Sequence, residues 1–406
     1  MRICVFSIVT YWHGLRGGMD LHGKHLLEGL SVKGYKIIVI STKHPSGKEY
    51  EEIKGLNIYY LKHTTFGSSR KGWKRQSINK FKDIIRKERI DIVLSQQTAG
   101  YGVVRIAKSM RIPFVSIMHG YQTMIFLSIL NQVMNFKKDH LSLVKSFLSS
   151  LYYTIFQELP ILKDSSVIIA VSDGVSKAIE KRPFIDSDKI KVINYGIDLK
   201  LFKFSEEERR ETRLKLNIAN NDKVVLFLSL LSKQKGADIA IRALNELARN
   251  NKSIKLIIAG NGEYFEDAKL LVTKFKFESR VIFTGFVHNE DTRKYYNASD
   301  IFIFPTLRLE SFGIVIAEAM ACSKPVIASD IGSIPDVIDN GIDGILTPIG
   351  DFKELARQIN LLLNDQQYSA KLAQNARQKA LDKFGLDRMI EETIKVFKLA
   401  ITHKKK

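Results

Sequence analysis

Two glutamates eight positions apart, Glu310 and Glu318, are the residues whose spacing first suggests chemistry. An apolar run ends near Pro305, a loop carrying Glu310 follows, and a helix is predicted to start near Phe312 or Gly313. The N-terminus of a helix presents unpaired backbone N–H groups and a partial positive charge, which together bind phosphate. Glu318 would lie about two turns into that helix. The two carboxylates could then bracket a diphosphate, each accepting hydrogen bonds from sugar hydroxyls.

The elements that must position these residues are short apolar runs alternating with helical patterns, which is typical of parallel α/β sheets. Strands are predicted over 2–9, 36–42, 56–62, 91–95, 112–118, 166–171, 190–193, 223–230, 254–259, 280–284, 300–304, 325–329 and 344–347. Three helical segments close the chain after 351, and 122–157 has the spacing of one or two amphipathic helices. We expect two doubly wound domains of about six strands each. A ligand cleft is expected between them, at the carboxyl ends of the strands.

Residues 304–321 resemble the retaining family 4 glycosyltransferases of the GT-B fold, whose E-x7-E element matches Glu310 to Glu318. The continuations 324–332 and 343–346 are also similar to that family. The resemblance implies that Glu310 contacts the transferred sugar and that Glu318 contacts the nucleotide ribose. It also implies that the donor phosphates lie near the backbone at the start of the helix, at Phe312, Gly313 and Ile314.

Three other segments of the second half resemble the donor site of the same family. Residues 228–236 are similar to its phosphate-contacting loop, and this resemblance implies a catalytic role for Lys235. Residues 260–263 resemble its G-x-G turn, and 285–287 resemble the segment that lines the nucleotide base. The resemblance therefore implies that four further residues bind the donor: Gly260, Gly262, Gly285 and Val287.

The phosphate-contacting loop departs from the family pattern at one position. Where the family has an arginine, this chain has Leu230. A diphosphate leaving group gains negative charge as the glycosidic bond breaks, and positioned cations stabilise it. Three alternatives follow: Lys235 and backbone amides hold the diphosphate alone, the nearby Lys233 assists, or the protein is weakly active or inactive.

The first half of the chain resembles the acceptor side of the family. Gly17 and Gly18 correspond to its glycine loop, although the same pair could simply start a helix. His119 stands at the carboxyl end of a predicted strand, where the family often has a histidine that touches the donor sugar. The resemblance therefore implies a catalytic role for His119. A single histidine in such a loop is otherwise usually structural. By this resemblance an acceptor-side domain covers 1–198 and a nucleotide-sugar donor domain covers 199–385. A helix with a basic tail over 386–406 is expected to pack back toward the first domain.

The charge of the chain is strongly positive and unevenly distributed. Its 406 residues carry 63 lysines and arginines against 43 aspartates and glutamates, a net charge of +20. The first 200 residues contribute +15 of this excess, and 62–89 is the most basic stretch. We expect that 62–89 and 122–157 bind an anionic membrane face and present a lipid-linked sugar, although 62–89 could equally be a solvated helix face. Because 62–89 has few aromatic residues for base stacking, no nucleic acid partner is expected.

Cysteine usage and hydropathy bear on the cellular compartment. Two cysteines cannot form a disulfide framework, and no run of 18 or more apolar residues occurs. We expect a cytoplasmic protein that can associate with the inner face of the membrane. A D-x-D triplet at Asp186 and Asp188 is interpreted as a solvated turn, so no metal is predicted, and the only cofactor-like molecule is the donor substrate itself.

The resemblance implies a retaining, metal-independent hexosyltransferase. It would move a sugar from a nucleotide diphosphate sugar, with UDP and GDP as the base options, to a glycan or lipid-linked acceptor in cell-surface polysaccharide or lipopolysaccharide synthesis. Two alternatives are a sugar nucleotide epimerase or phosphorylase of the same fold, and a degenerate nucleotide-sugar-binding protein.

Overall fold

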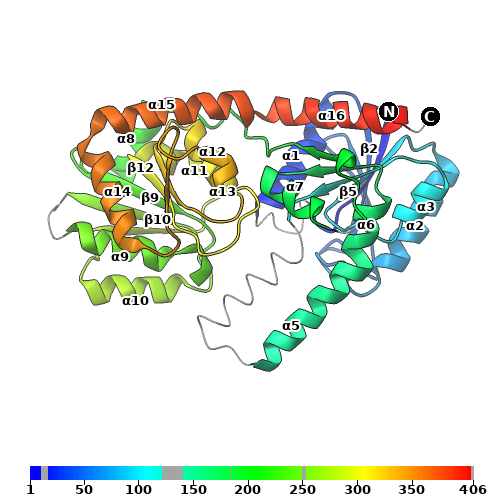
Figure 1. Ribbon diagram of the computed structural model, residues 1–406, viewed down its shortest axis with the longest axis horizontal. Coiled ribbons are helices and arrows are strands. Elements are labelled where there is room, and N and C mark those ends of the chain that lie inside the picture. Colours follow the sequence, from blue (N-terminus) through cyan, green and yellow to red (C-terminus); the bar gives the residue numbers. More distant parts are fainter. Residues whose placement is uncertain (11–16, 121–139, 183, 249–252, 404–406) are drawn as a thin grey trace. The chain divides into compact units, whose positions relative to one another are not determined.

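The computed structural model describes residues 1–10, 17–120, 140–182, 184–248 and 253–403 (Figure 1). The chain divides into two compact units. The first unit contains 1–196 and 386–406, and the second contains 197–385. Each unit has its own sheet and its own helices, so each is described by itself.

The first unit is built on an eight-stranded sheet with the order β3-β4-β2-β1-β5-β6-β7-β8. All neighbouring strands are parallel except the β3/β4 pair. The strands are β1 (Arg2–Phe6), β2 (Lys36–Thr42), β3 (Tyr50–Ile53), β4 (Leu56–Leu61), β5 (Ile92–Gln96), β6 (Phe114–Met118), β7 (Val167–Ala170) and β8 (Ile190–Val192). Runs such as Ile-Val-Leu-Ser-Gln in β5 are buried along their whole length, as expected for parallel strands covered on both faces.

The helices of the first unit lie between its strands, and one comes from the far end of the chain. They are α1 (Gly18–Val32), α2 (Trp73–Lys87), α3 (Val104–Ser109), α5 (His140–Tyr153), a π-helical turn η2 (Thr154–Glu158), α6 (Leu159–Asp164), α7 (Asp173–Glu180), the 3₁₀ turn η3 (Ser187–Lys189) and α16 (Leu386–His403). Helix α16 packs on α1, where Gly29 leaves room for the side chain of Ile390. The C-terminal helix therefore completes the first unit.

The second unit has a six-stranded, entirely parallel sheet with the order β11-β10-β9-β12-β13-β14. Its strands are β9 (Lys223–Leu228), β10 (Ile254–Ala259), β11 (Val281–Gly285), β12 (Ile301–Phe304), β13 (Val326–Ser329) and β14 (Ile345–Thr347). Its helices are α8 (Glu206–Lys215), α9 (Ala237–Ala248), α10 (Phe265–Phe275), α11 (Thr292–Ala298), α12 (Ile314–Ala321), α13 (Ile334–Val337), α14 (Phe352–Asn364) and α15 (Gln366–Lys383), with short 3₁₀ turns η4 (Lys233–Lys235) and η5 (Asn289–Asp291). An apolar core that includes Val225, Phe227, Leu244 and Ile258 lies between these layers.

A partly buried cluster of charges ties α8 to the start of β12. Asp300 accepts hydrogen bonds from Arg209 Nη2 at 2.6 Å and from Arg213 Nη2 at 3.0 Å. Arg213 is almost fully buried, and its guanidinium also donates to backbone carbonyl groups, among them that of Ala298 at 2.9 Å. Val224 at the start of β9 donates its N–H to the same carboxylate at 2.7 Å. One aspartate thus connects a helix with two central strands.

The predicted strands and the α/β fold class are confirmed, with two corrections. The sheet of the first unit has eight strands, and its edge strand β3 was not predicted; the Tyr-Glu-Glu-Ile sequence of β3 is half polar and has no buried residue. Helix α12 begins at Ile314, so Glu318 lies about one turn into it and not two. Of the predicted amphipathic stretch 122–157, residues 122–139 lie outside the described residues, whereas 140–157 are helical. Within the part of the chain that is described, no helix is long and apolar enough to cross a membrane.

Candidate active site

The centre of the candidate site is an ion pair between Lys235 and Glu310 in the second unit. Lys235 Nζ lies 2.6 Å from Glu310 Oε1, and both side chains are largely buried. Lys235 ends the turn η4 after β9, and Glu310 lies in the loop after β12. Because β9 and β12 are neighbouring parallel strands, their carboxyl ends bring these two loops together. The structure therefore unites two residues that are 75 positions apart in the sequence.

The two loops are packed backbone against backbone. Gly236 has φ +79°, and a Cβ atom there would overlap the carbonyl oxygen of Pro305. Leu307 donates its N–H to the carbonyl oxygen of Gln234 at 2.8 Å. The hydroxyl of Thr306 lies 3.3 Å from Glu310 Oε1. The position of Lys235 relative to Glu310 is thus fixed by main-chain contacts as well as by the ion pair.

Gly236→Ala is expected to impair the site while the unit stays folded. The new methyl group would push the η4 turn away from Pro305, and a displacement of about 1 Å at a reacting centre costs about 10²-fold in rate. The measurement is kcat/KM for the reaction predicted from the sequence, sugar transfer, together with the melting temperature. Gly47→Ala is the matched control, because Gly47 also has φ +79° but has open space around the added atom. Equal losses in both variants would mean that backbone strain, and not the contact with Pro305, is responsible.

The loop that carries Glu310 is held on its other side by the segment before α13. Ser333 donates its N–H to the carbonyl oxygen of Glu310 at 2.8 Å. Further along the loop, Phe312 is buried with its ring edge-on to Phe384 at a centroid distance of 5.3 Å. Gly313 then caps α12 with φ +86°, a left-handed conformation that glycine adopts without strain. The N-terminus of α12, from Ile314, thus follows directly on the Glu310 loop.

Glu318 lies in the core of the second unit. Its carboxyl group is buried, and Oε2 accepts a hydrogen bond from the Tyr296 hydroxyl at 2.9 Å. The same hydroxyl lies 3.1 Å from the carbonyl oxygen of Val315. Burial raises the pKa of Glu318 to about 8, partly opposed by the Tyr296 hydrogen bond. Because this carboxyl group is enclosed, a ribose could reach it only after Glu318 changes its conformation; the ribose contact stays a prediction.

Glu318 is expected to make the stability of the second unit fall as the pH rises from about 4.5 to about 8. In this window the folded protein keeps a proton that the unfolded chain releases, so each pH unit costs up to about 1.4 kcal/mol in the free energy of unfolding. Glu318→Gln cannot ionise and should lack this dependence. Denaturant unfolding of both proteins at several pH values measures the difference, and parallel curves across the window would contradict the prediction.

The glycine turn after β10 and the loop after β9 are also packed closely. Added Cβ atoms at Gly260 and Gly262 would overlap the carbonyl oxygens of Ser229 and Leu231, respectively. Gly260 donates its N–H to the carbonyl oxygen of Gly285 at 2.9 Å, which joins the turn to the end of β11. The loops after β9, β10, β11 and β12 therefore form one continuous rim at the carboxyl edge of the sheet.

The side chains on this rim are mostly uncharged. Leu230 is 60% exposed where the family pattern has an arginine, and Phe286 is 66% exposed beside the partly buried Val287. Lys233 is exposed in the same turn as Lys235. Lys235 is thus held beside Glu310 by its ion pair, and Lys233 lies at the start of the same turn.

His119 lies in the first unit at the end of β6, and both of its ring nitrogens are occupied. Nδ1 lies 2.7 Å from the Tyr195 hydroxyl, and Nε2 lies 2.8 Å from Gln96 Oε1. The backbone N–H of His119 donates to Gln97 Oε1 at 2.7 Å. Burial lowers the pKa of His119 to about 3, so the imidazole is neutral at physiological pH. It therefore cannot supply positive charge, and a ring nitrogen could bond a ligand only by giving up Tyr195 or Gln96. The contact of His119 with a donor sugar stays a prediction.

Gly17 and Gly18 start helix α1, with Gly17 at the N-cap position. Gly17 has φ −154° and ψ 170°, an extended conformation open to any residue, and an added Cβ atom would have free space. The backbone therefore gives no steric reason for glycine at position 17, and an acceptor-side role for the pair stays a prediction.

The D-x-D triplet lies in the turn that was predicted for it, since Asp186 accepts a hydrogen bond from the N–H of Asp188 at 3.0 Å.

Two family descriptions match the chain in succession. Residues 16–201 match Glycosyltransferase Family 4, and residues 208–379 match Glycosyl transferases group 1. The chain belongs to the family 4 glycosyltransferases. This glycosyltransferase is 26% identical to an uncharacterized glycosyltransferase of Methanocaldococcus jannaschii, over 97% of this chain and 98% of the relative. It is 24% identical to the alpha-monoglucosyldiacylglycerol synthase of Streptococcus pneumoniae, over 85% and 75% of the two chains.

Comparison with solved structures establishes the fold of this glycosyltransferase. The crystal structure of Anabaena HepE in complex with UDP and glucose matches with a TM-score of 0.76 at 22% identity, over 98% of this chain and 99% of that chain. Two α/β Rossmann-like domains with parallel sheets confirm the predicted GT-B fold.

Sequence reasoning missed the partners that hold the glycosyltransferase's site residues. Thr306 lies two residues after the end of β12, and a polar residue just beyond a strand could have marked it. Tyr296 contacts Glu318 from a separate helix, and Gln96 and Tyr195 contact His119 from two other segments. No local pattern identifies such long-range partners, because they depend on the order of the strands in the sheet.

Proposed function

We propose that this glycosyltransferase transfers a hexose from a nucleotide diphosphate sugar to a glycan or lipid-linked acceptor with retention of configuration and without a metal ion. The observation that carries the proposal is the Lys235–Glu310 ion pair beside the N-terminus of α12. Backbone N–H groups and a fixed ammonium group suit a diphosphate, and a carboxylate next to them suits sugar hydroxyls. These two chemistries belong to the two halves of one donor.

In the proposed reaction, the bond between the anomeric carbon and the diphosphate oxygen breaks while a bond to the acceptor oxygen forms. The acceptor hydroxyl gives its proton to the departing diphosphate. The sugar passes to the acceptor without forming a covalent bond to the protein. Lys235 and the α12 amides stabilise the charge that develops on the leaving group. Glu310 orients the sugar, and the rigid packing of the two loops keeps both groups in position before the donor arrives.

Support for the donor class comes from the fold. Anabaena HepE was crystallised with UDP, with UDP and glucose, and with UDP-glucose. We propose that the rim formed by Gly260, Gly262, Gly285 and Val287 receives the nucleotide of a UDP or GDP sugar. The exposed Phe286 could then contact the base or its ribose.

An open pocket in the first unit is the proposed acceptor site. Aliphatic side chains form its floor, including Leu27, Val39 and Ile58, while polar groups such as Gln96 and Thr98 also line it. A pocket of mixed character suits an acceptor that has both a sugar or polar head and an apolar part, which favours a lipid-linked acceptor in envelope polysaccharide or glycolipid synthesis.

The experiment that tests this function is a thermal-shift screen with UDP-, GDP-, ADP- and TDP-sugars, followed by assays of nucleoside diphosphate release with lipid-linked and free acceptors. A ligand present at about 100 times its dissociation constant stabilises the folded state by about 2.7 kcal/mol, which is readily detected. We expect one nucleotide series to give a shift and to release its diphosphate when an acceptor is added. The absence of any shift across the series would contradict the proposal.

The exposed Leu230 favours a second candidate, a sugar nucleotide-binding protein without transferase activity. A site that has lost one phosphate-binding cation could still bind the donor through Lys235. Such a protein would show the thermal shift but release no nucleoside diphosphate. If Leu230→Arg then gained transfer activity, Leu230 would be identified as the lesion.

A further inference from the structure

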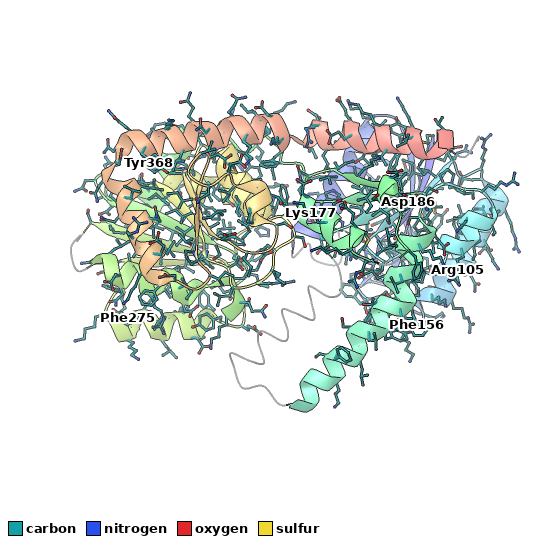
Figure 2. The ribbon with its side chains drawn as sticks, in the orientation of Figure 1. Arg105, Phe156, Lys177, Asp186, Phe275 and Tyr368 are labelled. Atoms are coloured by element: carbon teal, nitrogen blue, oxygen red, sulfur yellow. The ribbon has the colours of Figure 1, made fainter. Side chains whose placement is uncertain are left out.

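A row of apolar side chains is exposed on one helix of the first unit. Between positions 147 and 156, six large apolar side chains are each 44–57% exposed: Phe147, Leu148, Leu151, Tyr152, Ile155 and Phe156. They lie on α5 and on the π-helical turn that follows it, in pairs spaced four residues apart, so they form one stripe along the helix. We call these six residues the α5 stripe. Figure 1 shows α5 extending away from the strands of its unit, and Figure 2 labels Phe156 on the π-helical turn η2 that follows α5.

The stripe ends beside the proposed acceptor pocket. Gln157, the next residue, is buried, and its Oε1 lies 3.3 Å from Ser69 Oγ and 3.4 Å from Thr98 Oγ1. Ser69 and Thr98 both line the pocket. One turn of helix therefore presents apolar side chains to the outside and contacts the pocket wall on its inner face.

Cations lie along the helical segment that carries the stripe. Arg70 Nε lies 3.3 Å from the Tyr153 hydroxyl, and Lys145 is exposed on α5 itself. At the far end of this helical segment, Arg105 and Lys108 of α3 share a single acid, Asp164. The sequence from 140 to 157 contains no aspartate or glutamate. This combination of apolar and basic groups complements the acyl and anionic head-group regions of a lipid bilayer.

We propose that the α5 stripe inserts into the interfacial region of an anionic bilayer, with Arg70 and Lys145 against lipid phosphates. Tyr152 and Phe156, whose rings lie 5.0 Å apart, are the aromatic residues at the head-group level. The bilayer contact then places the pocket behind Gln157 next to the membrane surface. Delivery of a lipid-linked acceptor through this contact rests on the proposed transferase function; the bilayer contact itself does not.

Cosedimentation with vesicles tests the proposal. The full-length protein should bind vesicles of phosphatidylcholine mixed with phosphatidylglycerol and bind pure phosphatidylcholine at least about tenfold more weakly. Leu151→Glu should reduce binding to the anionic vesicles about tenfold or more. Leu270→Glu is the matched control, because Leu270 is an exposed leucine on helix α10 of the second unit. The double variant Arg70→Gln and Lys145→Gln should weaken binding to the anionic vesicles. Its control is the double variant Lys353→Gln and Lys371→Gln, which makes the same change of charge on the second unit and should leave binding unchanged.

A second measurement locates the stripe in the bilayer. Tyr152→Trp should add fluorescence that lipids brominated on their acyl chains quench, in comparison with the parent protein, whose tryptophans are Trp12 and the fully buried Trp73. Equal binding to neutral and anionic vesicles, equal effects of Leu151→Glu and Leu270→Glu, or an unquenched tryptophan would overturn the proposal. A dimer that Leu151→Glu dissociates would also overturn it, because the stripe would then bind a second copy of the chain. Thermal shifts induced by the donor in the same variants distinguish failure of the bilayer contact from failure of the proposed function, because the proposed donor site lies in the second unit.

Discussion

Lys235→Met is expected to lower kcat/KM for sugar transfer by about 10²- to 10³-fold, the cost typical of removing one positioned group that stabilises a developing negative charge. Methionine keeps the length and apolar stem of lysine, so the packing near Phe304 should survive. Glu310 would lose its partner at 2.6 Å and become free to take other conformations. Both kcat and the affinity for the donor should therefore fall.

Lys233→Met is the matched control for this prediction, because Lys233 is exposed in the same 3₁₀ turn. Initial rates of nucleoside diphosphate release measure both variants. The pair Lys235→Met and Glu310→Gln should be strongly non-additive, since each variant already breaks the same ion pair. A large loss in Lys233→Met with normal rates in Lys235→Met would assign the phosphate contact to Lys233 instead.

The largest expected effect on stability is that of Asp300→Ala, which should lower the free energy of unfolding of the second unit by about 3 kcal/mol. The substitution leaves the nearly buried guanidinium of Arg213 without its counter-ion and removes the acceptor for Val224 N–H. We take the lower end of the range for broken buried ion pairs because Asp300 is a quarter exposed and partly screened.

The control for this variant is Asp291→Ala, which removes an aspartate from an exposed pair with Lys294 and should cost less than about 1 kcal/mol. Both tryptophans, Trp12 and Trp73, belong to the first unit, so their fluorescence should not report on the damaged unit. Circular dichroism should show an earlier transition in Asp300→Ala while the tryptophan transition stays in place. Coincident shifts of both signals would mean that the two units unfold together.

Strand positions were predictable from the sequence because parallel strands are continuous apolar runs. The run 254–259 coincides with β10, and 36–42 coincides with β2. The edge strand β3 carries two glutamates and lacks this signal, so it was missed. The predicted start of α12, at Phe312 or Gly313, was too early, because Gly313 has a left-handed conformation and lies outside the helix.

The candidate site was predictable at its anchor points but not in its environment. Lys235 and Glu310 were identified separately, and the order of strands β9 and β12 explains why they meet. The enclosure of Glu318 could not be foreseen, because Tyr296 is 22 positions away and its orientation depends on the packing of α11. Similarly, nothing in the local sequence of His119 indicates that Tyr195 and Gln96 occupy its ring nitrogens.

The packing of α16 on α1 also has a consequence for synthesis on the ribosome. The second unit is one uninterrupted segment, 197–385, whereas the first unit needs residues from both ends of the chain. Helix α16 leaves the ribosome only after residues 1–385 have been made. We therefore expect the second unit to complete its fold first, although it is translated later than most of the first, and the first unit to wait for α16. The order of folding would then reverse the order of translation.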